Sequence, residues 1–304
     1  MVKLLTILVA LFFANELLYA QLQPNIIFIF TDDHGFNDLE SHDKFDEVQM
    51  PNVESMVENG VNCSAAYVTA PQCTPSRAGL ITGQYQQNFG LNSNKDLPLN
   101  PNILTIPDRL SKLGYITGMV GKWHLAPLHT SEKWLTKQGK TSIEEVSKEQ
   151  LRSFFPKHYG FEAFAKGQEQ RYYSNFDIKG RATSIKPIHY QKYEKGAFSK
   201  LWRIELQTKL AEVFIENASR KRRPFFLYLS YFAPHAPLED IPQKYLHRFD
   251  SARIQSRHQF PENRLAGLAS LAAIDNGVGH ILQKLDSLDI LENTIIFFMS
   301  DNGG

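Results

Sequence analysis

A cysteine and an arginine lie about one helical turn apart in the segment Cys73-Thr74-Pro75-Ser76-Arg77. Pro75 favours the first turn of a helix, because its missing N–H would have no partner there and its fixed φ is already helical. Cys73 is therefore expected at about the N-cap. Free N–H groups of the first turn and the helix dipole would favour an anion such as sulfate or phosphate there, and Arg77 can turn toward it. The alternative is a helix start with a buried structural thiol.

Carboxylates and an amide follow two apolar, strand-like segments of the chain. Asp32 and Asp33 end the first segment, and Asp301 and Asn302 end the other. In open α/β sheets, ligands bind beyond the carboxyl ends of the strands. Two adjacent carboxylates repel each other unless a cation lies between them, so the pattern favours a hard metal such as Ca²⁺ or Mg²⁺. The alternative for each pair is a polar turn that only ends its strand.

Basic side chains follow two further apolar segments. Lys122 and His124 come after 115–120, and His235 comes after 224–232 in a loop that prolines hold extended. Because side chains alternate along a strand, Lys122 and His124 are expected to point the same way. A single histidine at such a place is more often structural than catalytic, so these residues gain weight only together with the others.

Apolar segments and amphipathic helices alternate along the chain and must position these side chains. The apolar segments are continuous rather than alternating, which is typical of strands buried on both faces of a parallel sheet. We therefore predict an α/β fold with a mixed, mostly parallel sheet flanked by helices. Region 127–200 shows no sustained period, and we expect a long surface excursion that could contact substrate. The predicted strands are 25–30, 115–120, 224–232 and 294–299. The predicted helices are 51–59, one that follows the N-cap at about Cys73 and runs to about 82, 106–113, 201–219 and 263–288.

Two segments resemble motifs of one enzyme family. CTPSRAGLITG at 73–83 is similar to the signature of the type I sulfatases, and GKWHL at 121–125 resembles a second segment of the same family. The resemblance runs from Asn25 to Gly304 and implies an alkaline-phosphatase/sulfatase-like fold. It also implies that Cys73 is oxidised to formylglycine by the formylglycine-generating enzyme during secretion, and that the protein hydrolyses sulfate monoesters.

The resemblance implies a metal site as well. One Ca²⁺ would be held by Asp32, Asp33, Asp301, Asn302 and the residue made from Cys73. It would neutralise sulfate oxygens and lower the pKa of the attacking hydroxyl.

Catalytic roles are carried over residue by residue. In the family, one hydroxyl of the hydrated aldehyde at position 73 attacks sulfur, and the other then expels sulfate. Arg77 and Lys122 would stabilise the charge on the hydrate and on the transferring group. His124 resembles the base that takes the proton of the second hydroxyl, and His235 resembles a donor to the departing alcohol.

Net charge, the N-terminal segment and short motifs indicate the expected compartment and partners. The 304 residues carry a net charge of +1, so bulk charge does not indicate nucleic acid as a partner. Residues 1–20 read as a signal peptide too short to span a membrane, so we expect a secreted or lumenal protein, extracellular or lysosomal. Cys63 and Cys73 could pair, but the resemblance needs Cys73 free. Asn62 and Asn217 both fit the N-glycosylation pattern.

We expect residues 21–304 to form a sulfatase catalytic domain that is incomplete at its C-terminus. The family has a second sulfate-contacting lysine and a smaller C-terminal domain after the segment that matches 301–303, and neither follows here. A sulfated small molecule or glycan is the expected substrate. Two alternatives stay open: a phosphatase or phosphodiesterase of the same superfamily, against which Cys73 argues, and a non-catalytic binder of sulfated glycans or inactive fragment.

Overall fold

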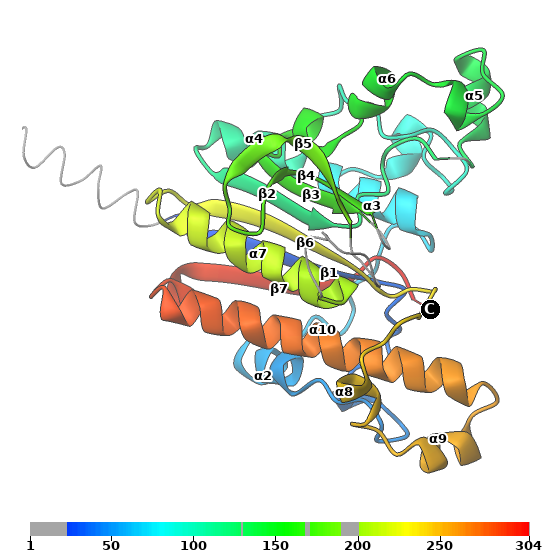
Figure 1. Ribbon diagram of the computed structural model, residues 1–304, viewed down its shortest axis with the longest axis vertical. Helices are drawn as coiled ribbons and strands as arrows, with labels where there is room; N and C mark the ends of the chain where they lie inside the picture. Colours follow the sequence, from blue (N-terminus) through cyan, green and yellow to red (C-terminus); the bar gives the residue numbers. More distant parts are fainter. Residues whose placement is uncertain (1–22, 129, 168–170, 190–200, 304) are drawn as a thin grey trace, which may run out of the picture.

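The strands form one seven-stranded sheet in the order β5-β4-β3-β2-β6-β1-β7. The computed structural model describes residues 23–128, 130–167, 171–189 and 201–303, and the predicted signal peptide lies outside them. Helices lie on both sides of the sheet (Figure 1), and each side has its own hydrophobic cluster. The predicted α/β architecture with a mixed, mostly parallel sheet is confirmed.

Four parallel strands position the candidate site, and all four were predicted from continuous apolar segments. Their side chains alternate between the two clusters, as the pleat requires: in β6, Leu227 and Leu229 face one cluster, whereas Phe226 and Tyr228 face the other. The four strands in their order across the sheet are β2 (Ile116–Gly121), β6 (Phe225–Pro234), β1 (Asn25–Asp32) and β7 (Thr294–Ser300).

Helices cover the two faces of this sheet. Leu210 of α7 and Ile274 of α10 belong to the cluster on one face, and Ala78 and Ile81 of α3 belong to the cluster on the other. A capping box between Thr105 and Asp108 fixes the start of α4. These helices are α2 (Pro51–Asn59), α3 (Cys73–Thr82), α4 (Ile106–Lys112), α7 (Arg203–Ser219) and α10 (Pro261–Ser287).

Helix α10 is long and apolar enough to cross a membrane by length and composition alone. However, 67% of its apolar window is buried inside the protein, as in the core helix of a globular domain. The described chain also contains four further short helices and five 3-10 turns. They are α5 (Glu132–Lys137), α6 (Lys148–Arg152), α8 (Gln243–Leu246) and α9 (Ser251–Arg257), with 3-10 turns η1 (Glu40–His42), η2 (Gln86–Phe89), η3 (Ile143–Glu145), η4 (Pro156–Tyr159) and η5 (Leu291–Asn293).

The prediction of a surface excursion at 127–200 was wrong in part. This region contributes three strands to the sheet, namely β3 (Ala163–Gly167), β4 (Arg171–Phe176) and β5 (Ala182–His189). Strand β3 pairs parallel to β2, and β4 and β5 continue the sheet in antiparallel fashion. These strands mix polar with apolar residues, so they lack the continuous apolar signal of β1 or β6. For β4 and β5 the reason is that an outer antiparallel strand needs only one apolar face.

Strand β7 differs from its prediction as a buried strand. It pairs with β1 and lies at the edge of the described sheet. Ile295 and Phe297 are 46% and 44% exposed on one side of it. The apolar composition of 294–299 therefore predicted the strand correctly but not its place in the sheet.

Packing between β2 and α7 leaves no room for a side chain at Gly118. A Cβ there would lie 2.3 Å from Cε2 of Phe214. We expect Gly118→Ala to lower the free energy of unfolding by about 1–3 kcal/mol, the usual cost of overpacking a core. Gly267→Ala is the matched control, because its Cβ would meet nothing within 4 Å and would stabilise α10. Urea unfolding followed by circular dichroism measures both, and equal effects of the two substitutions would contradict the packing argument.

Candidate active site

Helix α3 begins at Cys73, and Gln72 is its N-cap. Cys73 is therefore the first helical residue rather than the N-cap predicted from the position of Pro75. The first i→i−4 hydrogen bond explains the shift, because Ser76 N donates to Gln72 O at 3.1 Å. Pro75 still lies in the first turn, where its missing N–H costs nothing.

The predicted row of free N–H groups at this helix start is also largely absent. Ser76 N–H bonds Gln72 O, Pro75 has no N–H, and Thr74 N–H donates to Asn94 Oδ1 at 2.9 Å. Any anion beside Cys73 must therefore rely mainly on side chains rather than on backbone donors.

Arg77 lies at the centre of the site and is 1% exposed. Its Nη2 is 3.1 Å from Asp32 Oδ1, and its Nε donates to Asp301 Oδ2 at 3.0 Å. Its Nη1 donates to Ser230 Oγ at 2.5 Å and reaches Tyr228 OH at 3.4 Å. One guanidinium thus joins α3 to the ends of β1, β6 and β7, which brings together residues that lie far apart in the sequence.

Lys122 supplies the second buried cation. Its Nζ is 2.5 Å from Asp32 Oδ2, so each oxygen of Asp32 faces a positive group. Burial opposes ionisation of Asp32, but the charges of Arg77 and Lys122 outweigh it and lower the pKa of this carboxyl. Burial and the neighbouring Asp32 raise the pKa of Asp301 instead. The protonation of each of these two carboxyls therefore depends on the other and on the same two cations.

The predicted metal ligands converge on one point. Ligand atoms of Asp32, Asp33, Asp301 and Cys73 all lie within 4.8 Å of one another. Asn302 Nδ2 donates to Asp33 Oδ1 at 2.5 Å, whereas the Oδ1 of Asn302 is buried and accepts no hydrogen bond from the described residues. Three carboxylates and an unpaired amide oxygen are the donors that Ca²⁺ prefers, so the residues present fit such an ion.

The two histidines lie in contrasting environments. Strand β2 ends at Gly121 and His124 has a φ of 54°, so the alternation rule stops before Lys122 and His124. His124 is still near enough to Lys122 for that charge, after burial, to help lower its pKa well below the ordinary value. Its Nδ1 is buried and has no hydrogen-bond partner within the described ranges.

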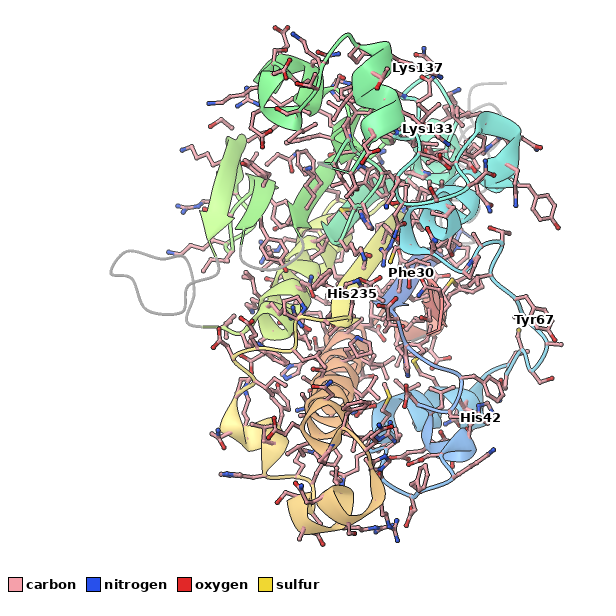
Figure 2. All side chains as sticks on the ribbon, turned by 90° about the vertical axis from the view of Figure 1, so that its right-hand side faces the viewer. Phe30, His42, Tyr67, Lys133, Lys137 and His235 are labelled. Atoms are coloured by element: carbon pink, nitrogen blue, oxygen red, sulfur yellow. The ribbon has the colours of Figure 1, made fainter. Side chains whose placement is uncertain are left out.

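His235 lies at the open side of the site, on the loop after β6. Its Nε2 is 3.5 Å from Asp33 Oδ2, and its side chain is 32% exposed. In Figure 2 it lies near the end of β1, which Phe30 marks. The predicted strand-end residues are thus brought together, with His124 inside and His235 at the rim.

Sequence reasoning missed residues that support these groups. Ser230 and Tyr228 of β6 contact Arg77, and Asn94 bonds the start of α3. A serine inside the apolar segment 224–232 was a usable signal for Ser230, because a polar side chain there must find a partner. Asn94 lies in a polar turn and gave no comparable signal.

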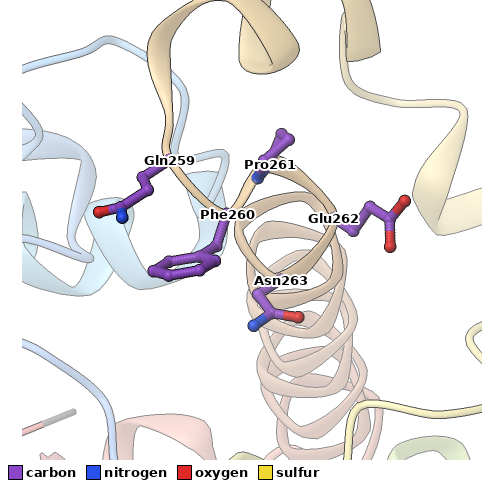
Figure 3. A pocket seen from close by; sticks show the side chains of 5 residues that line it. All are labelled: Gln259, Phe260, Pro261, Glu262 and Asn263. Carbon is purple, nitrogen blue, oxygen red and sulfur yellow. The ribbon is translucent and has the colours of Figure 1, made fainter.

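A separate hollow lies at the start of α10, away from this site (Figure 3). It brings no second set of chemically reactive groups to one place. Its lining residues are Gln259, Phe260, Pro261, Glu262 and Asn263.

The Cys73 thiol is a poor nucleophile as it stands. It is 5% exposed, and burial followed by the charge of Asp32 raises its pKa to about 12. At pH 8 we expect iodoacetamide to label Cys63, which is exposed, at least about a hundredfold faster than Cys73, because only the thiolate reacts. Peptide mass spectrometry over time measures both rates in one sample. Equal labelling in the folded protein would contradict the buried, high-pKa thiol.

Comparison with known proteins points to one family. The family model described as Sulfatase matches residues 24–304. Arylsulfatase J of Mus musculus is 29% identical over 292 residues, covering 93% of this chain and 43% of that protein. N-acetylgalactosamine-6-O-sulfatase of Bacteroides thetaiotaomicron is 28% identical over 336 residues, covering 92% and 59%.

A solved structure shows the same fold. The crystal structure of Ps i-CgsB superposes with a TM-score of 0.68 at 27% identity, covering 93% of this chain and 59% of that one. The chain spans about half the length of the curated relatives it matches. On the match over 24–304, this chain belongs to the sulfatase family.

Proposed function

We propose that residues 21–304 carry a sulfatase catalytic domain that hydrolyses sulfate monoesters, with the residue made from Cys73 as the nucleophile. The observation that carries the proposal is the position of Cys73. It begins α3 within 4.8 Å of ligand atoms from three carboxylates, and Arg77 and Lys122 pair with one of them. Cations and a metal-binding cluster beside one nucleophile suit transfer of an anionic group.

The metal is proposed to be Ca²⁺, held by Asp32, Asp33, Asp301, Asn302 and residue 73. When bound, it supplies a positive charge that neutralises sulfate oxygens and lowers the pKa of an attacking hydroxyl. The buried, unpaired Oδ1 of Asn302 supports this ligand set.

Residue 73 is proposed to be formylglycine, made by the formylglycine-generating enzyme during secretion. Its hydrated aldehyde supplies one hydroxyl for attack and a second for release of sulfate. The high pKa of the unmodified thiol supports this choice, because little thiolate would exist at neutral pH.

The surrounding side chains then take distinct roles. Arg77 and Lys122 hold fixed positive charge beside the transferring group. The Nδ1 of His124 is buried and the pKa of its ring is depressed, so the ring is neutral and can accept a proton from residue 73. His235 is at the solvent-accessible rim beside Asp33, where a departing alcohol would leave, and it is proposed to donate the proton to that alcohol.

A sulfated glycan is the proposed substrate class. One relative is named N-acetylgalactosamine-6-O-sulfatase, and Ps i-CgsB, at 26% identity, was crystallised with k-i-k-neocarrahexaose. Strands β3 to β5 add polar and aromatic residues to one edge of the sheet, which offers surface beyond the sulfate itself.

Hydrolysis of an aryl sulfate tests the proposed function. The full chain, secreted from a host with the formylglycine-generating enzyme, is expected to release sulfate, and Cys73→Ala is expected to abolish release. Cys63→Ser is the matched control and should keep activity, because Cys63 is exposed and outside the site. Mass spectrometry of the Cys73 peptide should show the aldehyde. Binding of a sulfated glycan without release would favour the binder, and faster hydrolysis of a phosphate ester would favour the phosphatase.

Calcium binding tests the metal site without relying on activity. Ca²⁺ at about a hundred times its Kd should stabilise the protein by about 2.7 kcal/mol, which a thermal melt detects. Asn302→Ala removes the unpaired amide oxygen and should weaken Ca²⁺ binding in calorimetry, whereas Asp286→Ala, on the exposed side of α10, should not. Equal affinity in both variants would contradict the ligand set.

Secretion is proposed with glycosylation at Asn62 rather than at Asn217. Residues 60–69 are all exposed, so Asn62 is accessible. Asn217 lies within α7, and its Nδ2 donates to Gly180 O at 2.8 Å, so a glycan would break a hydrogen bond in a packed place. We expect Asn62→Gln to remove the glycosidase-sensitive mass shift of the secreted protein and Asn217→Gln to leave it. The reverse result would contradict the assignment.

A further inference from the structure

The residues on either side of Cys73 both bond to Asn94, one to its side chain and the other to its backbone N–H. Thr74 N donates to Asn94 Oδ1 at 2.9 Å, and Asn94 N donates to Gln72 Oε1 at 3.0 Å. Gln72, the N-cap of α3, makes no side-chain capping bond of its own. Asn94 therefore performs from outside the helix the capping that the N-cap residue would normally perform.

We infer that Asn94 is a positioning residue that fixes residue 73 at the start of α3, an inference that rests on the proposed role of residue 73. The two hydrogen bonds bracket residue 73: one restrains the backbone of Thr74, and the other restrains the side chain of Gln72. A first helical turn otherwise frays readily, because its N–H groups have no partner within the helix. A nucleophile must be held close to its reacting geometry, since small misplacements slow a reaction strongly.

The segment that carries Asn94 is itself held in place. Asp96 is 5% exposed, its Oδ2 accepts Asn92 N at 3.0 Å, and its N donates to Ser93 O at 3.2 Å. The ammonium of Lys133, on α5 (Figure 2), forms an ion pair with the same carboxylate. The restraint on residue 73 thus extends through Asn94 and Asp96 to α5.

Unmodified protein in a Cys63→Ser background provides the test, because Cys73 is then the only thiol. Asn94→Leu keeps side-chain size but removes the acceptor, whereas Asn94→Asp keeps an acceptor oxygen. Asn92→Leu is the matched control, since Asn92 is exposed and only its backbone N–H is bonded among the described residues. Hydrogen exchange of the Thr74 amide by NMR and alkylation of Cys73 by iodoacetamide are the two measurements.

We expect Asn94→Leu to speed exchange at Thr74 by about fivefold, the loss of one hydrogen bond, and to speed alkylation of Cys73 as the helix start opens. In Asn94→Asp, the exchange rate of the Thr74 amide should stay within about twofold of that in the parent protein. Asn92→Leu should change neither the exchange rate of Thr74 nor the alkylation rate of Cys73. Lys133→Met, at a side chain that is 70% exposed, should give a smaller increase without threatening the fold.

Unchanged rates in a folded Asn94→Leu protein would overturn the inference, as would equal changes in Asn92→Leu. If Asn94→Leu does not fold, the absence of any increase in Lys133→Met overturns it instead. None of these measurements uses sulfate release, so a failed sulfatase proposal and a failed positioning role remain distinguishable.

Discussion

The structure depends on a set of charges buried where four strands end. Arg77 and Lys122 lie against Asp32 and Asp301 with almost no solvent contact. Removing charges from water is costly, and breaking such a pair typically costs about 3–5 kcal/mol because a charge is left buried and unpaired. Each member comes from a different element, so the charges balance only when β1, β2, β7 and α3 have all assembled. The site is therefore complete only in a sheet that has all three of these strands and α3 in place.

The same arrangement places the two histidines of the site in different environments. His124 is enclosed near two cations and stays neutral, whereas His235 is open to solvent beside a carboxylate. One ring is thus held near buried cations, and the other lies at the open side of the site. Environment rather than residue type sets this difference.

Much of the fold and the site could be predicted from the sequence, and the reasons are specific. Strands β1, β2 and β6 are buried on both faces, so their apolar segments are continuous, and the polar residues at their ends stood out. Strands β3 to β5 lie toward one edge and alternate weakly, so no such signal existed.

Contacts between distant residues set the remaining details. Nothing local identifies Asn94, because its partners Gln72 and Thr74 lie about twenty positions earlier in the chain. The start of α3 was misplaced by one residue, because Pro75 restricts where a helix can begin without fixing its first residue. The exposed edge position of β7 depends on strand order, which composition does not encode.

The occupied N–H groups at the start of α3 have a consequence for how this site can diverge among related proteins. A cradle of backbone amides is insensitive to mutation, because every residue except proline provides the same donor. Here Thr74 and Ser76 have their amides already bonded, so an anion bound at the proposed site would face side chains instead. The charges that such an anion would meet are therefore set by side chains, which single substitutions can change. Selectivity among anions could then evolve without any alteration of the backbone.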